Sequence, residues 1–169
     1  MKEELKHKIG LVVVIASLLG VCTMPMGIAD DETEIICNVT AGVYTVTIEP
    51  MSINYGSLPA GGYNSSGTIN ATNAGAVTID LLVCGANAFQ TPPGTGQWIL
   101  SNTPGSDQYR HTFTPAAGTE TNLTTSNQLL KDDLAAGLSQ EFTLTIYVPT
   151  TIANPGDYST EVTVTATGP

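Results

Sequence analysis

Residues 142–148 read Phe-Thr-Leu-Thr-Ile-Tyr-Val, a run in which every second side chain is aliphatic or phenylalanine and the side chains between are threonine or tyrosine. Successive side chains of a β-strand point to opposite faces, so this pattern predicts a strand with one buried and one solvent-facing side. The same alternation recurs at residues 44–49, 77–84 and 158–166. These four segments predict a protein built from strands.

Weaker strand patterns lie between them, at residues 34–39, 53–55, 67–72, 97–100 and 109–113. Turn-forming sequences rich in Pro, Gly and Asn separate the strands, for example Asn154-Pro-Gly-Asp. The pattern offers at most one helical turn, at residues 127–134. About eight or nine short strands with regular turn signals predict an all-β fold, specifically an antiparallel β-sandwich.

The N-terminus carries a different signal. A lysine-rich start precedes the charge-free apolar run at residues 9–21, and a small-x-small exit follows at Gly27-Ile28-Ala29. This order is typical of a cleaved secretory signal peptide. An uncleaved membrane anchor, a lipoprotein signal and a pilin-type leader remain as alternatives. Each of them also places the protein outside the cytoplasm.

The sequence therefore predicts three parts. Residues 1–29 are the signal peptide, residues 30–42 form an N-terminal strand segment, and residues 43–169 form one sandwich domain. The expected location is extracellular, at the cell surface.

The charge balance limits the partners. After residue 29 the chain has two basic residues, Arg110 and Lys131, against 13 acidic ones, a balance of −11. So negative a chain repels phosphate backbones, which excludes nucleic acid as a partner. The same part of the chain holds 24 threonines, a residue that favours strands.

Two cysteines remain after the leader, Cys37 and Cys84. In an exported protein such a pair most simply forms one disulfide, and closing its loop of about 48 residues would stabilise the fold by about 4 kcal/mol. Two free buried thiols are the alternative. An intramolecular bond is favoured, but donation of residues 34–39 to a second copy would instead link subunits in a covalent chain.

Four sequons fit the acceptor pattern for N-glycosylation, at Asn38, Asn64, Asn70 and Asn122. Sugars at these sites would suit a cell-surface glycoprotein.

Catalytic and metal-binding patterns are absent from the sequence. His111 is the one histidine after the leader, and no nucleophile motif accompanies it, so a structural or solvent-facing role is expected. Asp132 and Asp133 adjoin Lys131 and fit a solvated turn better than a catalytic pair. We expect no enzymatic activity, no cofactor and no metal site.

Three aromatic residues, Trp98, Tyr109 and Tyr63, could form a platform on which a sugar ring stacks. For Trp98 the sequence favours the hydrophobic core over the platform, because its neighbours Ile99 and Leu100 are apolar.

The C-terminal part carries a resemblance. Leu134-Ala-Ala-Gly-Leu-Ser139, an alternating strand to Pro149, Pro155-Gly-Asp-Tyr158 and Val162-Thr-Val-Thr-Ala166 follow one another. This order is similar to the last two strands of Ig-like modules in bacterial and archaeal surface proteins, including CARDB-like adhesion modules and modules of secreted glycosidases. A more remote resemblance is to TasA/camelysin-like and archaeal bundling-pilus subunits. The resemblance implies an Ig-like or jelly-roll-like sandwich and no particular activity.

Two functions fit these observations. The first is a secreted, non-catalytic structural or adhesive surface protein, a candidate subunit of a filament assembled by strand pairing, with other surface proteins or copies of itself as partners. The alternative is a carbohydrate-binding or accessory module of the cell envelope, with polysaccharide as partner.

The leader yields a first prediction. Cleavage after Ala29 removes residues 1–29, so intact-mass analysis of the exported protein should give a chain that begins at Asp30. A chain that still begins at Met1 or Leu11 would instead indicate an anchor or a pilin-type leader.

Overall fold

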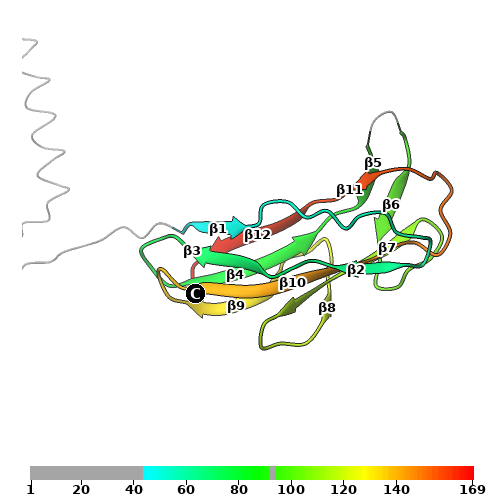
Figure 1. The fold of residues 1–169 in the computed structure, drawn as a ribbon. Helices are drawn as coiled ribbons and strands as arrows, with labels where there is room; N and C mark the ends of the chain where they lie inside the picture. The colour runs from blue at the N-terminus through cyan, green and yellow to red at the C-terminus, as the bar shows by residue number, and fades with distance from the viewer. Residues whose placement is uncertain (1–43, 92–93) are drawn as a thin grey trace, which may run out of the picture. The chain divides into compact units, whose positions relative to one another are not determined.

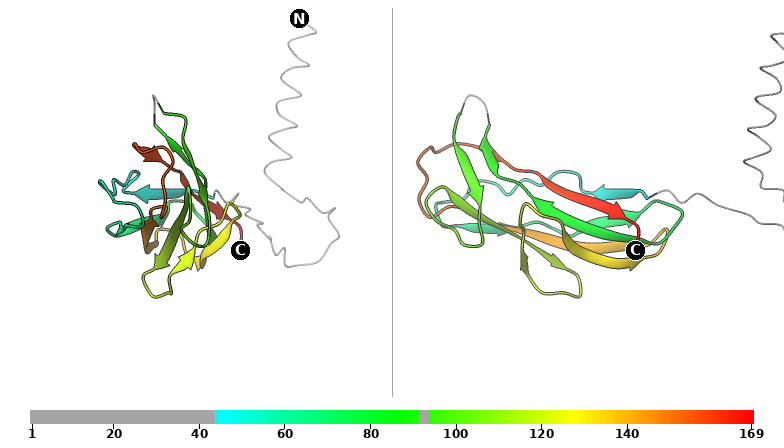
Figure 2. Two further views of the ribbon diagram at one scale, coloured as in Figure 1. Left: turned by 90° about the vertical axis from the view of Figure 1, so that its right-hand side faces the viewer. Right: turned by 180° about the vertical axis from the view of Figure 1, so that it is seen from behind.

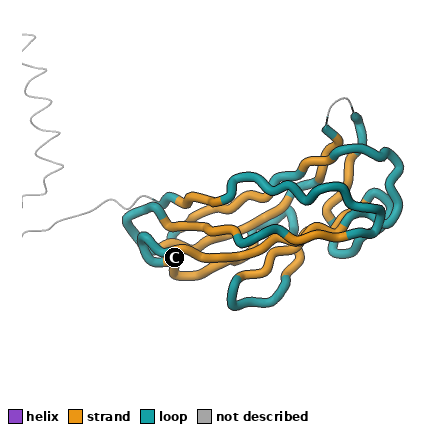
Figure 3. The backbone as a smooth tube through the Cα atoms, in the orientation of Figure 1, coloured by secondary structure: helices purple, strands orange, loops and turns teal. Residues whose placement is uncertain are grey.

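The computed structural model describes residues 44–91 and 94–169, and its regular secondary structure consists of strands (Figures 1 and 3). No helix occurs in this part of the chain, and hence none that is long and apolar enough to cross a membrane. The twelve strands are β1 (Val46–Glu49), β2 (Tyr63–Ser65), β3 (Ile69–Asn73), β4 (Ile79–Gly85), β5 (Ala88–Gln90), β6 (Gln97–Leu100), β7 (Gln108–Pro115), β8 (Thr121–Asn122), β9 (Gln128–Leu134), β10 (Ser139–Tyr147), β11 (Tyr158–Ser159) and β12 (Val162–Thr167).

The strands form two sheets of unequal width. The large sheet has nine strands in the order β1-β3-β10-β7-β6-β5-β11, with β2 beside β10 and β8 beside β7. The small sheet has the order β12-β4-β9 and is visible from behind in Figure 2. Every pair is antiparallel except β6 with β7. The predicted all-β sandwich is confirmed, with more and shorter strands than the eight or nine expected.

The alternation at residues 142–148 works as the sequence predicts. Phe142, Leu144 and Ile146 of β10 are buried, whereas Thr143 and Thr145 face outward and lie opposite threonines of β7. In β4, the central strand of the small sheet, Ile79, Leu81 and Val83 have no exposed surface. Each sheet thus has one apolar face, and burial of both faces against each other forms the core.

The core has two parts. The larger cluster lies between the two sheets and combines the inward side chains of β3, β4, β7, β9 and β10. The second cluster holds Ala88, Trp98, Tyr109, Ile146 and Val148. It forms where two segments of the chain pass between the sheets. β4 of the small sheet leads into β5 of the large sheet, and β11 of the large sheet leads into β12 of the small sheet.

The helical turn expected at residues 127–134 is wrong, because these residues form β9. Leu130 and Leu134 of β9 are buried, but Asp132 between them is exposed. The pairing of β9 with β4 shifts register between Ile79 and Leu82, and such bulges interrupt the alternation of a strand. The bulges therefore remove the period-two pattern by which this strand could be predicted from the sequence.

Burial in β4 yields a second prediction. Leu81→Ala leaves a cavity at a position with no exposed surface, so it should lower the free energy of unfolding by about 2–5 kcal/mol in chemical denaturation. Leu129→Ala in the neighbouring β9 is the matched control, since Leu129 is 57% exposed, and should cost less than about 0.5 kcal/mol. Equal losses in the two variants would contradict this core.

Candidate functional site

The sandwich is open along one side. Among residues 44–91 and 94–169, β1 pairs only with β3 and β12 pairs only with β4, so within this part of the chain each presents a free edge. The two strands lie side by side (Figure 1), and within the described residues no backbone hydrogen bond joins them. We call the strip between these two free edges the seam.

The four sheet edges differ in how they are protected. β9 is bulged and carries Lys131, Asp132 and Asp133, and charges and bulges both discourage a further strand from pairing. β12 has neither charged residue nor proline between Val162 and Thr167. Of the strands of the small sheet, only β12 therefore has an unprotected edge.

Residues 51–58 run along the seam, and we call this segment the strap. It was expected to contain a weak strand at residues 53–55, but it has no regular secondary structure. Its backbone makes no hydrogen bond to another backbone group within the described residues. Gly56 N–H instead donates to the side chain of Asn54, and Asn64 Nδ2 donates to the carbonyl of Tyr55.

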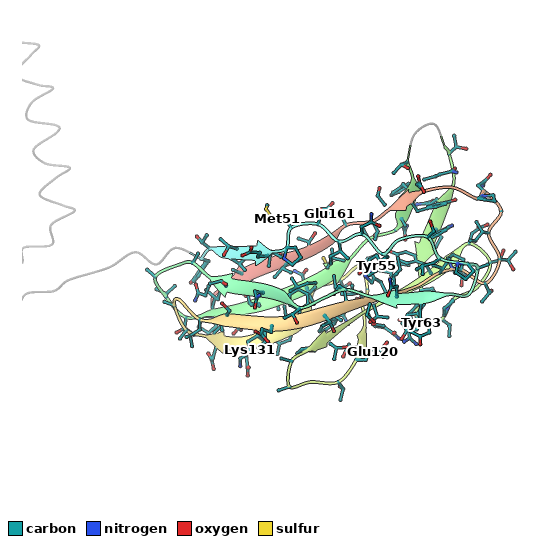
Figure 4. The ribbon with its side chains drawn as sticks, viewed as in Figure 1. Met51, Tyr55, Tyr63, Glu120, Lys131 and Glu161 are labelled. Atoms are coloured by element: carbon teal, nitrogen blue, oxygen red, sulfur yellow. The ribbon has the colours of Figure 1, made fainter. Side chains whose placement is uncertain are left out.

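Side chains hold the strap in place. Ile53 packs against the larger core cluster, Leu58 against the second, and Tyr55 against both. Met51 points to solvent and is 92% exposed (Figure 4). The strap is thus held by packing and not by strand pairing.

Two cavities flank the strap. One, of about 410 Å³, is mostly apolar: Ile69, Phe142 and Leu144 of the large sheet line it, as do Val162 and Val164 of β12. The other, of about 730 Å³, lies toward β11 and is lined by Trp98, Asp157 and Tyr158 together with the strap.

His111 lies at the centre of this arrangement. Its ring is 2% exposed, and its Nε2 shares a hydrogen bond of 2.9 Å with the hydroxyl of Tyr55. Burial lowers the pKa of His111 from 6.5 to about 4, because a charged imidazolium would lose its hydration there. Burial also raises the pKa of Tyr55 above its usual value. Both groups are therefore neutral at pH 7, and His111 has the structural position that the sequence allowed.

Of the three aromatic residues considered for a sugar platform, the structure brings Trp98 and Tyr109 together and places Tyr63 elsewhere. Trp98 is 7% exposed and Tyr109 is fully buried, whereas Tyr63 lies on the outer face of the large sheet with 67% of its surface exposed. Tyr63 stacks on Tyr147, and the Arg110 guanidinium lies 3.9 Å from the centre of the Tyr147 ring. Arg110 in turn pairs with Glu120.

Sequence reasoning missed Tyr158, which stacks on Trp98 with ring centres 3.9 Å apart. The only signal for Tyr158 was its place in an alternating strand. The alternation predicts a structural strand and no site, because nothing in the sequence brings residues 98 and 158 together.

The other predicted residues are dispersed. Of the sequon asparagines, Asn64 is exposed, Asn70 and Asn122 are half-buried, and Asn38 lies outside the described residues. Cys84 is half-buried on the side of β4 that faces away from the core, and Cys37 lies outside the described residues, so their bond stays a prediction. Among residues 44–91 and 94–169, no three His, Cys, Asp or Glu side chains gather to hold a metal ion.

Comparisons with known proteins add only distant likenesses. No protein-family model matches the chain, and no curated protein matches it. Among solved structures it is similar to the ASH/PapD-like domain 7 of human CEP192, with 12% identity, a TM-score of 0.44 and 83% of each chain covered. A chaperone-usher pilus structure matches with 15% identity and a TM-score of 0.42, over 86% of this chain and 100% of that one.

A family 123 glycoside hydrolase from Clostridium perfringens matches with 11% identity and a TM-score of 0.39, over 65% of this chain and 19% of that one. The sandwich is shown by the strands and sheets of the structure itself, and no family model identifies any of the families that the sequence resembles. With TM-scores below 0.5, none of the three supports a conclusion about function.

Burial of His111 yields a third prediction. Between about pH 4 and 6.5 the unfolded chain binds a proton at this residue and the folded chain does not, so stability must fall as the pH falls. From pH 7 to pH 5 the free energy of unfolding should drop by about 2 kcal/mol. Denaturation at the two pH values measures this drop.

Two variants test whether protonation of His111 causes this drop in the free energy of unfolding. His111→Gln should remove most of the drop, whereas Tyr55→Phe, which deletes the hydrogen bond but leaves the imidazole in place, should retain it. A drop of the same size in His111→Gln would contradict the assignment to His111.

Proposed function

We propose that this is a secreted, non-catalytic structural or adhesive protein of the cell surface. In this proposal its copies assemble when each adds an extended segment to the seam of the next. The observation that carries the proposal is the free, unprotected edge of β12 beside an apolar cavity. A free strand edge offers a row of unpaired N–H and C=O groups, and an extended peptide can pair with it as a further strand.

The cavity suits the side chains of such a strand. Val162 and Val164 point from β12 into the cavity of about 410 Å³, whose other walls are apolar as well. A strand added beside β12 would direct every second side chain to the same side, because strand side chains alternate. Backbone pairing would supply affinity and the cavity would favour aliphatic residues.

The chain has a suitable donor in residues 34–39, Glu-Ile-Ile-Cys-Asn-Val. In an extended conformation Ile35, Cys37 and Val39 share one face, which supplies the required alternation. One acidic residue, Glu34, occurs in the segment. Donor and acceptor on the same chain allow head-to-tail growth, because each added copy presents a new free seam.

The position of Cys84 argues against a covalent chain. Cys84 lies on the central strand of the small sheet and pairs with Thr163 of β12. A strand added outside β12 would be two strand spacings from Cys84, roughly 10 Å, whereas a disulfide needs Cα atoms within about 7 Å. Cys37 of a donated segment therefore could not bond to Cys84 of its acceptor. Donation is best tested with a reductant present, which prevents a disulfide between Cys37 and Cys84 of the same chain.

A fourth prediction concerns assembly of the mature protein, residues 30–169. Because its copies are strongly negative, we expect filaments in negative-stain microscopy at about 0.15 M salt or above, where like-charge repulsion is screened. Deletion of residues 34–39 removes the donor, and Ser52→Trp places an indole in the lining of the apolar cavity. Each change should abolish filaments.

The two defective proteins also test head-to-tail pairing. The deletion variant keeps its seam and Ser52→Trp keeps its donor, so a mixture should form dimers that grow no further, as measured by light scattering. Ser57→Trp is the matched control, since Ser57 lines only the cavity on the other side of the strap, and it should still form filaments. Filaments without residues 34–39 would refute strand donation.

A further inference from the structure

The larger cavity, of about 730 Å³, has a composition unlike that of the apolar cavity in the seam. Ile146, Val148 and Trp98 give it an apolar floor, and Tyr158 lies beside them. Ser52, Asn54, Ser57 and Asp157 line it as well. The cavity thus combines an aromatic wall with several hydrogen-bonding side chains, and we call it the aromatic cleft.

The aromatic wall is rigid. Tyr158 stacks on Trp98 with ring planes 15° apart, and Tyr109 packs on Trp98 in turn. The Tyr158 hydroxyl donates a hydrogen bond of 2.7 Å to the carbonyl of Asn154. Trp98 is almost completely buried, but Tyr158 is only half-buried and lines the cleft. A ring fixed in this way loses little conformational freedom when a ligand packs against it.

Polar groups of the cleft are available to a ligand. The side chains of Ser52, Ser57 and Asp157 line the cleft and are exposed. Exposed hydroxyl and carboxylate groups can exchange their hydrogen bonds with water for hydrogen bonds with the hydroxyls of a ligand.

We propose that the aromatic cleft binds a pyranose unit of a neutral polysaccharide. A pyranose has an apolar C–H face that packs on an aromatic ring and a rim of hydroxyls that donate and accept hydrogen bonds, and the cleft offers a counterpart to each. A purely apolar ligand would leave the polar groups unpaired, and an anionic polymer would be repelled by a chain of net charge −10. The inference is independent of strand donation.

The experiment is affinity electrophoresis of residues 30–169 in native gels that contain hydroxyethyl cellulose, soluble starch, mannan or xylan. We expect at least one of these polymers to retard the protein. Tyr158→Ala should weaken that retardation at least tenfold, and Asp157→Asn should weaken it severalfold without disturbing the stack. Tyr158→Phe, which keeps the ring, should bind like the parent protein.

Tyr63→Ala is the matched control, because Tyr63 also belongs to a stacked aromatic pair but lies outside the cleft. Its retardation should equal that of the parent, and equal thermal midpoints exclude misfolding as the cause of any loss. The proposal is overturned if no polymer retards the protein. It is also overturned if Tyr63→Ala loses binding while Tyr158→Ala and Asp157→Asn keep it.

Discussion

The fold depends on the burial of the inner face of β4 against the large sheet. Ile79, Leu81 and Val83 have no exposed surface and share one cluster with Phe142 and Leu144 of β10. Burying each such side chain contributes about 1.5–3 kcal/mol to the stability of the fold. This contact joins the three-stranded sheet to the nine-stranded sheet. β9 and β12 pair directly with β4, and β2, β3 and β7 pair directly with β10, while the other strands join the large sheet through β3 or β7. An error in the alternation of β4 or β10 would therefore expose the core.

The unequal width of the sheets has a direct consequence. A three-stranded sheet cannot cover the inner face of a nine-stranded one, so the apolar surface near β1 and β3 extends beyond the edge of β12. The strap covers part of this surface with Ile53, Tyr55 and Leu58. Because the strap pairs with neither sheet, it provides apolar contacts without satisfying the edge of β12. The strap thus already provides hydrophobic burial at the seam, but the edge of β12 still has no backbone partner. An incoming strand would supply that pairing.

Local patterns predicted the strands that alternate regularly but not β2, β5, β8 or β9, and long-range contacts determined the sites. The runs at residues 77–84 and 142–148 predicted β4 and β10 because one face of each is buried and period two is the direct signature of that burial. The segment at residues 53–55 alternates equally well but pairs with no strand, since the pattern records burial and not the presence of a partner backbone. The seam could not be predicted, because it depends on which strands end each sheet. Trp98 illustrates the same limit: its apolar neighbours indicated the core, but its contact with Tyr158 joins residues 60 positions apart.

The strap separates the two proposed sites and contributes to both. Ser52, Ile53 and Tyr55 line the apolar cavity on one side and the aromatic cleft on the other. Tyr55 is fixed by its hydrogen bond to His111, a residue of β7 buried in the large sheet. The strap has no backbone pairing within the described residues, so this bond, the bond from Asn64 Nδ2 to the Tyr55 carbonyl and the packing of its three apolar side chains hold it in position. A displacement of Tyr55 would widen one cavity at the expense of the other. The two cavities therefore share one wall, which the hydrogen bond between Tyr55 and His111 helps to hold in place.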